Sequence, residues 1–79
     1  MSIIDRIQIV MVDVFEEDNP IHEMTVASDF KSWDSLGNIR LFIALESEFN
    51  IRFSTAEISG LKNVGELVRV IDGKQEVGL

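Results

Sequence analysis

The stretch WDSLG, residues 33–37, marks the point where an irregular segment gives way to a long apolar helix, predicted from about Ser35 to Phe49. Asp34 or Ser35 is the predicted N-cap. The Ser35 hydroxyl is therefore expected at the positive end of a helix, where free N–H groups and the helix dipole favour a negatively charged group such as phosphate. No base, metal ligand or second nucleophile lies nearby in the sequence. The pattern indicates a serine to which something is attached, rather than one that cleaves a substrate.

This predicted helix has two apolar stripes. On a helical wheel, four residues form an ordinary core face: Leu41, Phe42, Leu45 and Phe49. Leu36, Ile39 and Ile43 fall within about 60° of one another on a different side, with Ser35 beside them and Arg40 at their edge. A small bundle has one core. The second stripe is therefore expected either to pack on the preceding loop or to remain available to partners.

The length, composition and charge of the chain exclude several classes of function. A chain of 79 residues forms one small domain, and its 46% hydrophobic content suffices for a core despite a net charge of −7. A pI near 4.4 argues against nucleic-acid binding and favours basic protein partners. There is no cysteine, no basic start typical of a signal peptide and no apolar run of membrane-spanning length. We expect no membrane association and a cytoplasmic location.

The first helix is predicted to begin at Ser2, which precedes Asp5 by three residues, and to end near Phe15 or Glu16. Its core stripe consists of Ile3, Ile7, Val10 and Val14. Next comes a long loop whose first acids, Glu17 and Asp18, lack the ligand pattern of a calcium loop, so they are expected to be solvated. A loop this long should be anchored. The predicted anchors are Ile21, Met24, Val26, Phe30 and Trp33.

Two further helices are predicted after Asn50, which suits a left-handed helix end. Ser54 and Glu57 form a capping box before a helix of one or two turns. The last helix has a looser cap at Asn63 and ends at Gly73. Its apolar stripe consists of Val64, Leu67, Val68 and Ile71. The prediction is one all-α domain over residues 1–79: a bundle of three main helices and one short helix, with a long loop between helices 1 and 2 and a frayed tail at 73–79.

A family resemblance joins these features. Asp34-Ser35-Leu36, followed by Leu41, Leu45-Glu46 and Glu48-Phe49, resembles the phosphopantetheine attachment region of acyl carrier proteins, and the resemblance extends from Ile3 to about Ile71. It implies that coenzyme A donates 4′-phosphopantetheine to Ser35 through a phosphodiester, and that the arm's thiol holds an acyl group. It also implies a monomer without catalysis of its own. The implied partners are a phosphopantetheinyl transferase and the acyl-loading and acyl-processing enzymes of fatty-acid, polyketide or related lipid biosynthesis.

The resemblance also implies a partner-contact face along the second helix: Asp34, Leu36, Ile39, Arg40 and Ile43. Two positions differ from the usual family pattern. Gly37 stands where an acid, serine or threonine is more common, which is expected to leave room beside Ser35 for a partner or to be neutral. Arg40 stands where carriers of fatty-acid synthesis commonly have a glutamate, which favours an acidic partner surface and a specialised carrier.

The sequence favours three other functions less. A carrier of aminoacyl or peptidyl groups would share the arm and differ in its loading enzyme. An acidic helical adaptor would have no arm. A hydrolase is disfavoured, because the stretch lacks the first glycine of a nucleophile elbow and the chain's one histidine, His22, lies in the loop.

Overall fold

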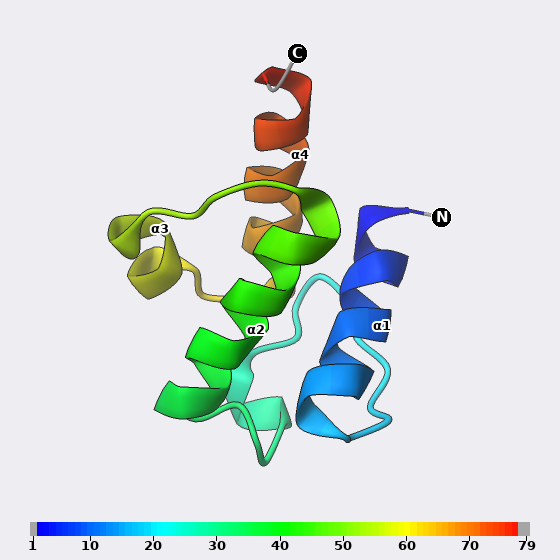
Figure 1. Cartoon of the computed structure of the whole chain (residues 1–79). Coiled ribbons are helices and arrows are strands. Elements are labelled where there is room, and N and C mark those ends of the chain that lie inside the picture. Colours follow the sequence, from blue (N-terminus) through cyan, green and yellow to red (C-terminus); the bar gives the residue numbers. More distant parts are fainter. Residues whose placement is uncertain (1, 78–79) are drawn as a thin grey trace.

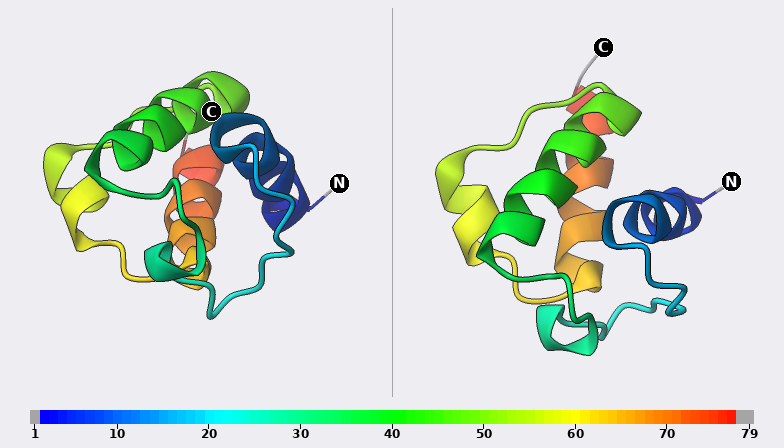
Figure 2. Two further views of the ribbon diagram at one scale, coloured as in Figure 1. Left: turned by 90° about the horizontal axis from the view of Figure 1, so that it is seen from below. Right: turned by 60° about the horizontal axis from the view of Figure 1, so that its bottom comes forward.

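Four α-helices and one 3₁₀ turn make up the computed structural model, which describes residues 2–77 (Figure 1). The elements are α1 (Ile3–Phe15), η1 (Ala27–Asp29), α2 (Ser35–Phe49), α3 (Thr55–Gly60) and α4 (Val64–Val77). Helices α1 and α2 run antiparallel side by side, α4 lies behind them, and α3 flanks α2 on the side away from α1 (Figures 1 and 2). The predicted fold class is confirmed: three main helices, one short helix and no strand in the described part. None of these helices is long and apolar enough to cross a bilayer.

The helix ends form as the capping residues predicted. The Ser2 hydroxyl accepts a hydrogen bond from the Asp5 N–H at 3.2 Å, and α1 ends at Phe15. Asn50 adopts the left-handed conformation, with φ of 54°, directly after α2. At α3, the Ser54 hydroxyl and the Glu57 carboxylate exchange hydrogen bonds with each other's backbone N–H at 3.1 and 2.8 Å. These local signals fix the helix boundaries because each one satisfies a group that the helix leaves unpaired.

The core lies between α1, α2 and α4. Its fully buried side chains include Ile7 and Met11 from α1, Leu41 and Leu45 from α2, and Ile71 from α4. The predicted core face of α2 is buried along its whole length. One core therefore uses one stripe from each main helix, and nothing in it requires the second stripe of α2.

The long loop is anchored partly as predicted. Phe30 is buried, and Ile21 and Trp33 pack against the core cluster. The prediction was wrong for Met24, which is 71% exposed, and for Val26, which lies at the surface. This part of the loop is fixed by its backbone instead.

Two backbone hydrogen bonds join the loop to α4. The Thr25 carbonyl accepts from the Val64 N–H at 2.9 Å, and the Glu23 carbonyl accepts from the Gly65 N–H at 2.8 Å. These donors belong to the first turn of α4, whose N–H groups have no acceptor within the helix. The loop accordingly passes the N-terminal end of α4 in Figure 2. The backbone on either side of the exposed Met24 therefore holds this part of the loop in place.

The predicted end of the last helix was wrong. Helix α4 continues through Gly73 to Val77, so residues 73–77 are helical and not a frayed tail, and residues 78 and 79 lie outside the described residues. Tertiary contacts carry the helix past the glycine: the Lys74 ammonium pairs with the Glu57 carboxylate at 2.9 Å, and the Gln75 side chain donates to the Phe49 carbonyl at 3.2 Å. These contacts offset the low helix propensity of glycine.

Gly73 offers a direct test of this helix continuation. Its φ is not positive, and an added Cβ would meet no atom within 4 Å. Gly73→Ala should therefore raise the free energy of unfolding by about 0.5–1 kcal/mol, because alanine loses less backbone entropy on folding. Urea denaturation of the two proteins measures the change. A destabilised variant would contradict a continuous helix at this position.

Candidate functional site

The site is built at the N-terminal end of α2. Asp34 is the N-cap, and its carboxylate accepts a hydrogen bond from the Gly37 N–H at 2.8 Å, while its carbonyl accepts from the Asn38 N–H at 2.8 Å. Ser35 is the first helical residue and its side chain is exposed. The sequence alone did not decide whether Asp34 or Ser35 is the N-cap. The structure assigns capping to the carboxylate of Asp34.

A carboxylate from the other end of the loop holds the segment before Ser35. Glu17 accepts hydrogen bonds from the backbone N–H groups of Lys31 at 3.0 Å and Ser32 at 2.8 Å, and from the Asn19 side chain at 3.3 Å. The two backbone N–H groups lower the pKa of Glu17 because they stabilise its charged form. Glu17 was predicted to be merely solvated. No sequence signal links it to amides fourteen and fifteen residues away.

Trp33 fixes the last loop residue before the cap. Its ring stacks on Phe15 with centroids 5.7 Å apart and meets the edge of Phe30 at 5.9 Å. Its indole N–H donates to the Asn38 side-chain oxygen at 2.8 Å, which ties it to the first turn of α2. The prediction that Trp33 pins the loop is confirmed, whereas the role of Asn38 had no signal in the sequence.

Gly37 has a different role from the one expected. It is buried, and a Cβ built on it would overlap the carbonyl oxygen of Ser32 and lie 3.0 Å from that carbonyl carbon. The space beside Gly37 is therefore occupied by the loop backbone and is not left for a partner. Glycine is needed because the loop crosses α2 at close contact.

The second stripe of α2 faces outward. Leu36, Ile39 and Ile43 are 58%, 55% and 62% exposed, so of the two alternatives, packing on the loop was wrong. The loop instead meets α2 through Gly37 and Asn38 on another side. Arg40 is also exposed, and its guanidinium forms no ion pair with any residue of the described range. The stripe and Ser35 thus share one open surface.

No catalytic group accompanies Ser35 among the hydrogen bonds of the described residues. The His22 ring accepts a bond from the Met24 N–H at 3.1 Å within its own loop. In residues 2–77 there is also no cluster of three or more metal-binding side chains. The geometry offers an exposed hydroxyl at a helix start, held by a fixed loop, and an apolar surface beside it.

Comparisons with known proteins agree with this geometry. The solution NMR structure of the holo acyl carrier protein from Geobacter metallireducens is similar over 99% of this chain and 91% of that chain, with 33% sequence identity and a TM-score of 0.89. The search against family models found no match. The fold and site define a small helical carrier domain, and the chain belongs to the acyl carrier protein family.

Gly37→Ala should lower the free energy of unfolding by roughly 1–3 kcal/mol, because the new methyl group displaces the Ser32 backbone. Urea denaturation measures the loss. Gly60→Ala is the matched control, since a Cβ at Gly60 meets nothing within 4 Å. Equal stabilities for Gly37→Ala and the wild type would contradict the close contact between the loop and α2.

Glu17 predicts a pH dependence. Because its folded pKa is lowered, its contribution to stability is fully present above the ordinary glutamate pKa of about 4.3 and is lost as the pH falls through the lower folded value. Glu17→Gln should therefore be less stable than the wild type at pH 7, and the difference should shrink toward pH 3. Denaturation curves at the two pH values measure it. A difference independent of pH would show that charge plays no part.

Proposed function

We propose that this protein holds acyl intermediates as thioesters on a 4′-phosphopantetheine arm attached to Ser35, and presents them to enzymes of fatty-acid, polyketide or related lipid biosynthesis. The observation that carries the proposal is the exposed Ser35 hydroxyl at the first position of α2, in a member of the acyl carrier protein family. The comparison protein is described as the holo form. For the present chain, the arm and its position are the proposal.

The residues around Ser35 fit such an arm. The hydroxyl is exposed. The N–H groups of Ser35 and Leu36 lie in the first turn of α2, where N–H groups have no acceptor within the helix. A phosphodiester on Ser35 would place its negative charge at this end of the helix dipole. The Asp34 carboxylate is already engaged with the Gly37 N–H, so it holds the turn in shape. When bound, the arm would supply a thiol; the chain's own part is to present and orient it.

Ser35 can serve several enzymes in turn only if they recognise the surface beside it. We assign this role to the exposed stripe Leu36, Ile39 and Ile43, with Asp34 and Arg40 at its edges. Tethering raises the concentration of the acyl group at whichever active site is docked. The Arg40 guanidinium at the edge of the stripe favours partners with a carboxylate at the matching position, which suits a specialised carrier.

Intact mass after incubation with coenzyme A and a promiscuous phosphopantetheinyl transferase tests the attachment. The wild type should gain one phosphopantetheine, and Ser35→Ala should gain none. If the wild type does not react under conditions in which a known carrier does, the proposal is wrong. The chain would then be better explained as an acidic helical adaptor. If the arm is attached, loading with acyl and aminoacyl donors separates an acyl carrier from a peptidyl carrier.

The docking stripe has its own test with a matched control. Ile43→Asp in the stripe and Ile9→Asp on α1 make the same change at residues that are 62% and 53% exposed. Neither should cost much stability, because neither side chain is buried. With the transferase, kcat/KM should fall about tenfold or more for Ile43→Asp, as for an apolar interface anchor, and within twofold for Ile9→Asp. Equal losses in the two variants would contradict a docking role for the stripe.

A further inference from the structure

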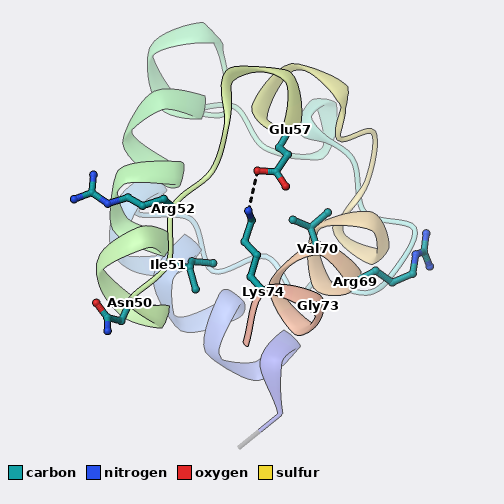
Figure 3. A pocket seen from close by; sticks show the side chains of 8 residues that line it. All are labelled: Asn50, Ile51, Arg52, Glu57, Arg69, Val70, Gly73 and Lys74. Carbon is teal, nitrogen blue, oxygen red and sulfur yellow. Dashed lines mark ion pairs between the residues drawn. The ribbon is translucent and has the colours of Figure 1, made fainter. Parts of the chain in front are cut away.

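A broad groove lies at the end of the molecule away from Ser35. It is wide open to solvent, has a volume of about 630 Å³, and lies between the segment after α2 and α4 (Figure 3). Its lining residues are Asn50, Ile51, Arg52, Glu57, Arg69, Val70, Gly73 and Lys74. Helix α2 separates it from Ser35 by fifteen residues, or about 22 Å at ~1.5 Å per residue. A molecule bound here would leave Ser35 free.

The floor of this groove is apolar and is kept open by a glycine. Ile51 and Val70 point into it from opposite walls (Figure 3). Gly73 lies beside them in α4, where a helix-interior glycine costs about 1 kcal/mol relative to alanine. Its φ is not positive and an added Cβ would meet nothing, so neither backbone conformation nor packing requires glycine. The missing side chain has one evident effect, which is that the groove stays unfilled.

The rims of the groove carry positive charge in a protein whose net charge is −7. Lys74 is paired with Glu57 across the groove at 2.9 Å (Figure 3). Arg52 and Arg69 lie on opposite rims with their guanidinium groups pointing away from the groove, and neither forms an ion pair within the described part of the chain (Figure 3). The guanidinium groups diverge, so they do not converge on one small anion. They would instead meet two carboxylates of a larger ligand that crosses the groove and reaches past both rims.

We propose that this groove binds an acidic amphipathic segment of a partner protein. Large apolar side chains of the segment pack on Ile51 and Val70, and carboxylates on either side pair with Arg52 and Arg69. An open groove suits a peptide segment, because a small ligand would stay largely solvated there. The site lets one partner hold the carrier while the surface beside Ser35 turns to another, which raises the effective concentration of the held carrier.

The test measures binding of a fluorescein-labelled amphipathic peptide of twelve residues, in which pairs of glutamates alternate with pairs of leucines. Fluorescence anisotropy should show saturable binding to the wild type. The double variant Arg52→Glu/Arg69→Glu should weaken it at least tenfold. Gly73→Leu should weaken it similarly by filling the floor. The double variant Lys31→Glu/Lys62→Glu makes the same change of net charge at two exposed lysines outside the groove, and it should alter binding less than twofold. A peptide with serines in place of leucines should bind at least tenfold more weakly.

Amide shifts in NMR spectra locate the bound peptide, and circular dichroism confirms that each variant is folded. Shifts centred on Ile51, Val70 and Gly73 would support the site. No binding, or an equal loss in Lys31→Glu/Lys62→Glu, would overturn the proposal, because the effect would then be absent or due to overall charge. If these amides shift as the protein concentration rises in the absence of peptide, the groove binds a second copy of the chain. That result would overturn the proposal of a separate partner protein.

Discussion

Two backbone N–H groups, those of Lys31 and Ser32, share the carboxylate of Glu17, and the placement of Ser35 depends on this contact. It joins the segment that follows α1 to the segment that precedes α2, and so closes the long loop on itself. A carboxylate that accepts backbone N–H groups forms stronger hydrogen bonds than a neutral acceptor. The loop can then cross α2 closely enough that only a glycine fits at Gly37.

The closed loop explains how so small a domain presents a hydroxyl in a defined place. Trp33 lies on the ring of Phe15 and also donates to Asn38, so one residue links α1, the loop and α2. Asp34 then caps the helix that it starts. Contacts with the core, the loop and the helix end therefore fix Trp33 and Asp34, while Ser35 itself stays exposed. A fixed backbone under an exposed hydroxyl suits a group that must be reached by several enzymes.

Most of the fold could be predicted from the sequence because its signals are local. Ser2, Asn50 and Ser54 act at their own helix ends, and the apolar spacing of each main helix includes the stripe that packs in the core. The end of α4 was missed for the opposite reason. Gly73 favours termination by local propensity, but Lys74 is held by a residue seventeen positions earlier, and no pattern in the sequence reveals that pair.

The candidate site also combines features with local sequence signals and features that depend on contacts between distant residues. Ser35 and the outward stripe of α2 followed from a motif and a helical wheel, and the exposure of the stripe agrees. Glu17, Asn38 and the contact at Gly37 depend on the path of the loop in space, which has no periodicity to read. The groove beside Gly73 was missed because its walls come from two segments that the sequence treats separately.

Hydrogen exchange of individual backbone amides tests most directly whether Glu17 organises the start of α2. In the wild type, the amides of Lys31, Ser32 and Gly37 should exchange far more slowly than in an unstructured peptide. In Glu17→Ala all three should exchange faster, while the Leu67 amide in α4 stays protected. Free-peptide rates for Lys31 and Ser32 in the wild type, or a Gly37 amide unaffected by Glu17→Ala, would contradict the account.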